Sequence, residues 1–207
     1  MIPTTTTHYL NLIMSNRPVM TSPPPEASEA FNVMQGLEER AASDTAVLAV
    51  LRRSASYNPG LYSPAFPYVE PLIYGHGEWR RQATYLAAAC WAKSRRQRDE
   101  GDLVRGQSLP TALRTLSQDP TNLHASKNIE KRFTALLDAD PDELPWRLRQ
   151  ITAVLDAAAV AIDWPSLLVD LWRWNHPDRP VQVRWARQFW APTRPAEKDS
   201  RSQTVDT

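Results

Sequence analysis

The sequence predicts an all-α protein in which about eight helices form a compact two-lobed bundle. Three observations predict this class. Only 6 of the 207 residues are glycine, few segments alternate apolar and polar residues as half-buried strands do, and apolar residues recur every three or four positions through most of the chain. Because no internal repeat of roughly 20 to 50 residues is seen, a solenoid is not expected. A chain of this length supports one substantial core.

Both ends of the chain lack the apolar periodicity of the middle. Residues 1–25 contain four consecutive threonines and finish in three prolines, and residues 191–207 are rich in proline and charge. Such segments cannot bury enough apolar surface to offset the entropy of ordering, so we expect disordered tails. Between them we expect an N-terminal helical lobe over residues 26–107 and a C-terminal helical lobe over residues 108–190.

The first lobe begins with two predicted helices. Residues 28–42 place Phe31, Met34 and Leu37 on one stripe, and Asp44 is expected to cap the helix that follows.

Residues 63–74 then hold three prolines, which permit only short helical pieces. Two glycines flanking His76 predict a break before a long helix, and that helix is expected to end in a polar loop after Ser94. The apolar stripe of that long helix consists of Trp79, Ala83, Leu86 and Cys90.

Helix starts in the second lobe are marked by residues that favour N-terminal positions. Ser108 and Ser126 are expected to cap two helices, and the acidic run from Asp140 precedes a third. Asp163 and Asp178 are expected to start the last two. Carboxylates at these positions are explained by the positive end of the helix dipole, so an acidic catalytic site is the weaker interpretation.

Residues that carry catalysis or bind metals are sparse. A single cysteine excludes an internal disulfide and a cysteine-based zinc site, and the apolar surroundings of Cys90 predict a packing role. The four histidines stand far apart without metal-ligand spacing, and the common phosphate-binding and nucleophile motifs are absent. No signal peptide or membrane span is seen. We therefore expect a soluble, cytoplasmic, non-catalytic protein without metal or cofactor.

Charge is informative only locally. The chain has 24 basic and 23 acidic residues, for a net charge of +1, which excludes a globally basic nucleic-acid-binding protein. Residues 80–105 contain seven basic and three acidic residues, which fits either phosphate binding or a solvated surface. From this run and from the last helix we nominate as nucleic-acid-binding residues Arg80, Arg81, Arg95, Arg96, Arg184 and Arg187.

Tryptophan is unusually frequent, with eight residues in the chain. Several late helices carry apolar residues on two faces, and a second apolar face indicates either a partner interface or a helix wrapped on both sides. The residues that we assign to a partner interface are Trp146, Trp172, Val183 and Trp190.

Four short motifs occur in the order found in a known family. They are Ser63–Tyr68 with Pro71, Gly106–Leu113, Glu130–Phe133, and Ile162–Pro165 followed by Leu167, Leu171 and Trp174. From Phe31 to Trp190 the chain resembles the CasB family, the small subunit of the type I-E CRISPR surveillance complex Cascade. Pro110 departs from the family pattern, which has a glycine there.

The resemblance implies an all-helical, two-lobed, non-catalytic subunit without cofactor, present as two copies that run head to tail. It implies that the partners are other Cascade subunits, guide RNA and target DNA, with no membrane and no small-molecule substrate. The implied role is to stabilise the paired guide and opened target, the R-loop, without sequence preference. The basic positions that the resemblance carries over are Arg52, Arg53, Lys131, Arg132 and Arg149. Asp138 and Gln150 stand where basic residues are expected.

Two other functions are considered. A free-standing helical DNA-binding regulator needs a helix-turn-helix with exposed polar readers, and residues 108–138 offer few such side chains outside the expected core. Sequence-specific binding by the isolated protein would favour this function. A helical enzyme or nuclease accessory needs clustered acids or histidines, and metal-dependent cleavage by the pure protein would favour it.

Overall fold

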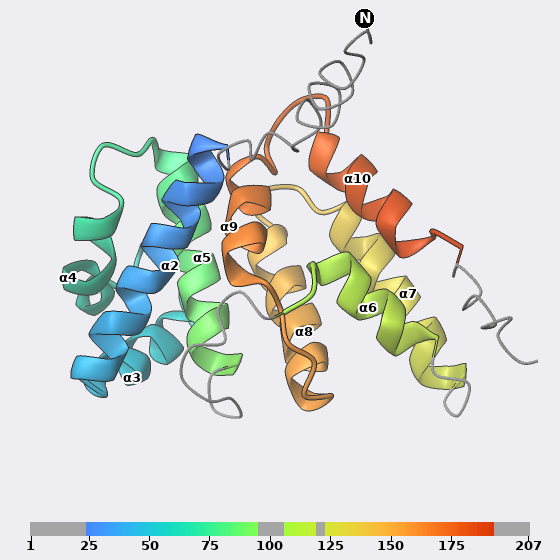
Figure 1. The fold of residues 1–207 in the computed structure, drawn as a ribbon, viewed down its shortest axis with the longest axis horizontal. Coiled ribbons are helices and arrows are strands. Elements are labelled where there is room, and N and C mark those ends of the chain that lie inside the picture. The colour runs from blue at the N-terminus through green and yellow to red at the C-terminus, as the bar shows by residue number, and fades with distance from the viewer. Residues whose placement is uncertain (1–23, 95–105, 119–122, 193–207) are drawn as a thin grey trace, which may run out of the picture.

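The protein is all-α in the computed structural model, which describes residues 24–94, 106–118 and 123–192 (Figure 1). Within these ranges there are nine α-helices, two short 3-10 helices and no strand. The helices are α2 (Pro25–Ser43), α3 (Ala46–Ser54), η2 (Ser63–Ala65), α4 (Phe66–Val69), η3 (Glu70–Leu72), α5 (Glu78–Ser94), α6 (Leu109–Ser117), α7 (Leu123–Leu137), α8 (Leu144–Ala157), α9 (Trp164–Trp172) and α10 (Pro180–Phe189). The predicted all-α class is confirmed. Most of the two predicted tails lies outside the described residues.

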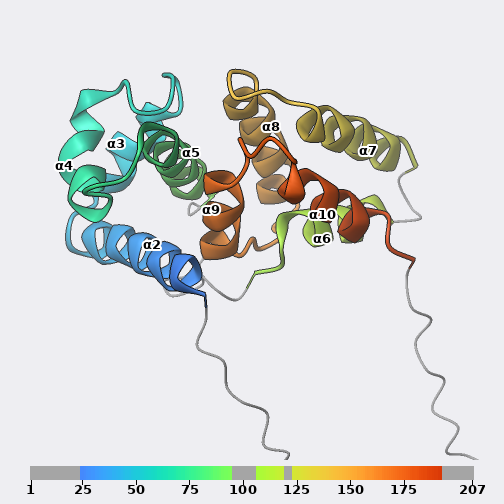
Figure 2. The ribbon, with the colours of Figure 1, turned by 90° about the horizontal axis from the view of Figure 1, so that it is seen from above.

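The helices form two groups that share a central pair. Figures 1 and 2 place α2 to α5 at one end, α6, α7 and α10 at the other, and α8 and α9 between them. Helix α9 belongs to the predicted C-terminal lobe, residues 108–190, but it packs against α2 and α5 of the N-terminal half. The buried side chains form one cluster that runs through both groups. The packing therefore does not follow the division of the sequence into two halves.

Several predicted helix starts are confirmed. The carboxylate of Asp163 accepts a hydrogen bond from the backbone N–H of Ser166 at 2.9 Å at the start of α9. Before α8, Asp140 accepts the N–H groups of Asp142 and Glu143 at 2.9 and 2.8 Å. Ser108 stands at the N-cap position of α6. The Asp163 carboxylate thus satisfies a backbone donor that the first turn of α9 leaves unpaired, whereas the Ser108 side chain makes no capping hydrogen bond and bonds to the Thr111 hydroxyl at 2.8 Å.

Other predicted helix starts are shifted. Asp44, the predicted N-cap, lies one residue before the observed N-cap Thr45, and its carboxylate accepts the N–H of Ala46 at 2.8 Å. Ser126 was expected to cap α7 but lies inside it, because the helix already begins at Leu123. Asp178 lies two residues before α10, whose N-cap is Arg179 in a left-handed conformation with φ of 50°.

The end of α8 has a residue with an unfavourable backbone conformation. The N–H of Val160 bonds to the carbonyl of Leu155 at 2.9 Å, and that of Ala159 bonds to the carbonyl of Asp156 at 3.0 Å. This pair of bonds is the Schellman arrangement, in which the residue after the C-cap is usually glycine. Here it is Ala159, with φ of 55°.

A close backbone contact joins the chain before α6 to the chain before α9. Gln107 and Ile162 form an isolated parallel bridge, in which the N–H of Gln107 bonds to the carbonyl of Ala161 and the N–H of Asp163 to the carbonyl of Gln107, both at 3.0 Å. A Cβ atom at Gly106 would lie 2.1 Å from the carbonyl carbon of Ile162. Only glycine therefore fits at this position without moving the backbone.

No helix of the described segments is both long and apolar enough to span a membrane.

Candidate nucleic-acid interface

The ends of α3 and α5 meet the second half of α8 around a concavity of about 480 Å³. Four cationic side chains and one carboxylate line it, and the lining residues are Arg52, Arg53, Lys93, Ser94, Arg149, Thr152, Ala153 and Asp156. Arg52 and Arg53 lie in the last turn of α3 and Lys93 in that of α5. Cations are favourable there because the last carbonyls of a helix carry partial negative charge.

Arg52 and Arg149 are held in place by hydrogen bonds to backbone carbonyls. Nε of Arg52 donates to the carbonyl of Ala92 at 2.7 Å, which ties α3 to the end of α5. A terminal nitrogen of Arg149 donates to the carbonyl of Tyr57 at 2.8 Å, while its buried Nε has no hydrogen-bond partner. Burial lowers the pKa of Arg149, but an arginine stays charged at neutral pH. The two guanidinium groups thus keep a defined position at the concavity.

Arg53 and Lys93 differ from this pair because both are exposed. No ion pair is formed by either side chain with any residue in the described ranges. An exposed cation beside positioned guanidinium groups is suited to bind a phosphate, which guanidinium contacts in a bidentate manner. With four cations around a single carboxylate, the geometry suits a polyanion.

Arg80 and Arg81 lie near the other end of α5, roughly 20 Å from Lys93 at the helical rise of 1.5 Å per residue. Arg80 pairs with Glu26 at 3.4 Å and Glu29 at 3.2 Å. Its guanidinium carbon lies 4.1 Å from the ring centroid of Trp172.

Arg81 likewise pairs within the fold, with Glu70 at 2.5 Å. The structure therefore does not bring either arginine to the concavity.

The remaining predicted basic residues lie on other helices. Lys131 and Arg132 are exposed on α7, and Arg187 is exposed on α10. Arg184 pairs with Asp170 of α9. None of these four lines the concavity. Arg95 and Arg96, which directly follow α5, lie outside the described residues.

Asp170 is held by two donors from α10. Besides the ion pair with Arg184, its second oxygen accepts the indole N–H of Trp185 at 2.6 Å. Burial raises the pKa of Asp170 and outweighs these two favourable contacts. The side chain is only 15% exposed, so its charge faces the interior of the fold.

Trp172 corrects the predicted partner interface, because its side chain is buried, with 5% exposure. Its indole N–H donates to Thr84 at 3.0 Å, and His76 meets its ring edge-on at a centroid distance of 5.4 Å. Since α9 packs against both α2 and α5 and its Leu168 and Trp172 are buried, the second apolar face of this helix belongs to the core.

The other three interface residues are exposed: Trp146 by 53%, Val183 by 45% and Trp190 by 49%. The Trp190 ring packs on Phe133 at a centroid distance of 5.7 Å and on Phe189 at 5.1 Å. It borders a smaller concavity that also includes Arg114 and Lys127. An indole fixed on one side and open on the other is typical of a contact surface.

The comparisons with known proteins decide the family. The sequence model of the family described as CRISPR-associated protein Cse2 matches residues 47–190. The chain belongs to the Cse2 family. A curated relative, CRISPR-associated protein Cse2 of Thermus thermophilus, is 43% identical over 149 residues, which cover 70% of this chain and 79% of the relative.

Solved structures resemble this Cse2-family chain over most of its length. The crystal structure of CasB from Thermus thermophilus has 36% identity and a TM-score of 0.66, and the match covers 82% of this chain and 100% of that one. CasB from M. ruber has 34% identity and a TM-score of 0.64, covering 79% and 93%. A chain of a CRISPR RNA-guided surveillance complex, pre-nicking, has 25% identity and a TM-score of 0.67, covering 79% and 92%.

Lys93 is the lining cation of this Cse2-family chain that the sequence analysis did not nominate. Its position near the end of the predicted long helix was a usable signal, because cations favour the last turn of a helix. Among the described residues, no group of three or more histidine, cysteine or acidic side chains could hold a metal ion. Cys90 is buried, and burial raises the pKa of its thiol.

Proposed function

We propose that this Cse2-family chain is a non-catalytic small subunit of a type I-E CRISPR Cascade complex in the cytoplasm. We further propose that the concavity between α3, α5 and α8 contacts the sugar-phosphate backbone of the guide RNA or the opened target DNA. The observation that carries the proposal is the convergence of Arg52, Arg53, Lys93 and Arg149 on one concavity. These residues come from helices separated by nearly 100 positions in the chain.

Several features support contact without sequence preference. The lining cations are arginine and lysine, which bind phosphate, whereas reading bases requires polar side chains that enter a groove. In RNA-guided recognition the pairing of guide and target supplies the specificity, and R-loop formation is nearly balanced in free energy. A few phosphate contacts by an accessory subunit therefore suffice to stabilise the R-loop.

The proposal also includes protein partners. The chain would contact other Cascade subunits and a second copy of itself, arranged head to tail. The likeness to a chain of an RNA-guided surveillance complex supports such an assembly. The exposed Trp146, Val183 and Trp190 supply apolar area for these contacts. Exposed aromatic residues are enriched at protein interfaces.

The test uses a guide-loaded Cascade that lacks its small subunit, with matched double-stranded DNA as the target. Adding this protein is expected to raise target affinity and the lifetime of the open complex. The double variant Arg53→Ala, Lys93→Ala is expected to lose most of that gain, because it removes two of the four lining cations. Both side chains are exposed, so their removal leaves no buried group unpaired and should not disturb the fold. Arg40→Ala is the matched control, since Arg40 bonds to Gly36 within α2 and does not line the concavity.

Absence of co-assembly would refute the subunit role, and an equal loss in the control would refute the assigned concavity. Sequence-specific DNA binding by the isolated protein would instead favour a free-standing regulator.

A further inference from the structure

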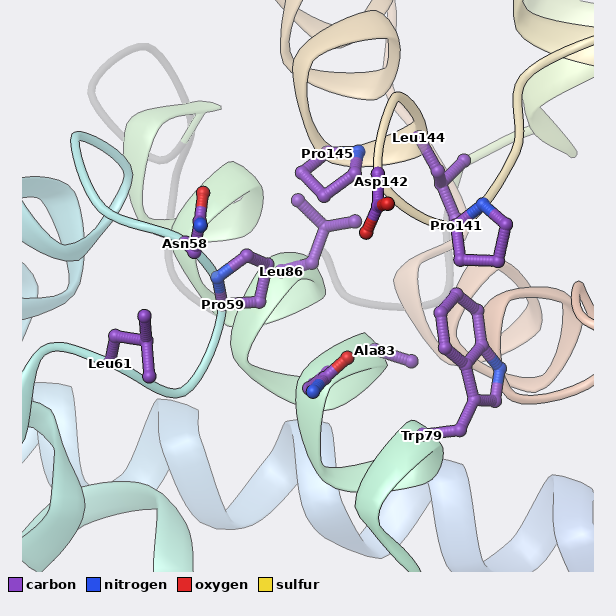
Figure 3. A pocket seen from close by; sticks show the side chains of 11 residues that line it. Asn58, Pro59, Leu61, Trp79, Ala83, Leu86, Pro141, Asp142, Leu144 and Pro145 are labelled. Carbon is purple, nitrogen blue, oxygen red and sulfur yellow. The ribbon is translucent and has the colours of Figure 1, made fainter.

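A second concavity, of about 300 Å³, lies between the loop before η2, the first half of α5 and the turn before α8 (Figure 3). Its volume is at the lower end of the roughly 300–1,000 Å³ typical of small-ligand sites. It therefore accommodates one or two side chains. The lining residues are Asn58, Pro59, Leu61, Trp79, Gln82, Ala83, Leu86, Pro141, Asp142, Leu144 and Pro145.

Most of the lining residues are apolar, although they share the wall with a comparable polar surface. Three of the lining residues are proline, and Ala83, Leu86 and Leu144 are anchored in the core with exposures of 1 to 2%. The indole N–H of Trp79 donates to the carbonyl of Leu171 at 3.1 Å, which fixes the ring. In Figure 3 the Trp79 ring lies beneath Pro141, on the same side of the concavity. Such a wall suits the aliphatic part of a side chain.

The polar groups of this concavity differ from those of the basic one. Asp142 is the single charged residue of the lining, and no lysine, arginine or histidine is present in it. Figure 3 shows the Asp142 side chain pointing from the turn toward Leu86, between Pro141 and Pro145. Within the described part of the chain, the Asp142 carboxylate forms neither an ion pair nor a hydrogen bond. The backbone N–H of Asp142 donates to the Asp140 carboxylate.

Asn58 adds a second polar group at the rim, where its exposed side chain can accept or donate a hydrogen bond. Gln82 is partly occupied, because its amide donates to Glu78 at 2.9 Å. The concavity therefore combines apolar walls, a fixed indole and one carboxylate available to a ligand. That combination is complementary to a cation on an aliphatic stem.

We propose that this concavity binds an arginine side chain from a protein partner. Its three methylene groups would pack against Leu86 and the prolines, while the guanidinium would bind the Asp142 carboxylate beside the Trp79 ring. Arginine fits better than lysine because its planar group both pairs bidentately with a carboxylate and stacks on aromatic rings.

Other occupants are less compatible with these walls. A phosphate backbone would be repelled by Asp142, and a purely apolar side chain would remove the carboxylate from water without a partner, which is costly. The inference does not depend on the proposed nucleic-acid contact, because it concerns a different concavity of opposite charge.

The test measures binding of a short probe to the full-length protein. The probe is the peptide acetyl-Leu-Arg-Leu-amide, and the comparison peptide carries citrulline, an uncharged isostere, in place of arginine. The NMR signal of the Trp79 indole N–H, assigned with Trp79→Phe, reports occupancy of this site. We expect the arginine peptide to shift that signal and the citrulline peptide to bind about tenfold more weakly, the effect of a lost charge-assisted hydrogen bond.

Two variants locate the binding. Asp142→Asn is expected to weaken the arginine peptide by about tenfold and leave the citrulline peptide unchanged. Asp138→Asn is the matched control, because Asp138 is an exposed carboxylate that does not line the concavity.

The proposal would be overturned by equal affinity for the two peptides, by an unshifted Trp79 signal, or by equal weakening in the control. It would also be overturned if a single-stranded oligonucleotide shifted the Trp79 signal instead. DNA binding measured on the same variants separates failure of this inference from failure of the proposed function.

Discussion

Replacing Ala159 by glycine should stabilise the protein. Ala159 adopts a left-handed conformation with φ of 55°, which costs a non-glycine residue about 1–2 kcal/mol. Glycine removes that strain but loses more entropy on folding, which offsets about 0.4–1 kcal/mol. The residue is exposed, so its methyl group contributes little packing. The net expectation, from the middle of each range, is a gain of about 0.8 kcal/mol in the free energy of unfolding.

The matched control is Ala153→Gly, an exposed position in the interior of the same helix. There glycine should destabilise by about 1 kcal/mol, because it has only its entropic cost. Urea unfolding measures both changes, and thermal unfolding should show a rise of about 2 °C for Ala159→Gly. The reasoning about Ala159 fails if glycine there leaves stability unchanged or lowers it while the control behaves as expected.

Three further predictions concern the backbone bridge, a buried carboxylate and the basic concavity. Gly106→Ala should lower the unfolding free energy by about 2–3 kcal/mol, because its Cβ would press on the backbone of Ile162; an unchanged urea midpoint would contradict this. The raised pKa of Asp170 means that the folded state favours the protonated form, so this group's contribution to stability falls as pH rises above about 4. Asp170→Asn should remove that decline in the unfolding free energy. Equal slopes of unfolding free energy against pH in the variant and the unmodified protein would argue against this role of Asp170. For single-stranded DNA, the double variant Arg53→Ala, Lys93→Ala should make the slope of log affinity against log salt shallower by about 1.4. Raising salt from roughly 50 to 200 mM should then weaken its binding about sevenfold less than it weakens the unmodified protein. An unchanged slope would exclude these residues from phosphate contact.

Local signals in the sequence predicted much of the fold. The start of α9 at Asp163 and the acidic turn before α8 were both identified, because a capping carboxylate acts within three residues of its own position. Ser126 shows the limit of such signals, because the sequence alone does not distinguish a serine inside a helix from a serine at its N-cap position. Arg52, Arg53 and Arg149 were carried over by resemblance, and their convergence on one concavity appears only in three dimensions.

Long-range pairing could not be predicted. Arg80 was nominated from charge alone, whereas its partners Glu26 and Glu29 lie about 50 positions away in the chain. Trp172 was assigned to a partner surface because its helix has two apolar faces. Both faces are covered by helices from the other end of the chain, and helical periodicity does not distinguish such a helix from one that docks on a partner.

The position of α9 also constrains the order in which the protein can fold during its synthesis. Because α9 covers faces of α2 and α5, a nascent chain that has left the ribosome only as far as α5 still exposes those faces to water. The first helices must therefore wait for about 80 further residues before their packing is complete. At synthesis rates of about 5–20 residues per second this lasts several seconds. The two halves of the chain are thus expected to fold as one cooperative unit, and a fragment ending after α5 should aggregate or require a chaperone.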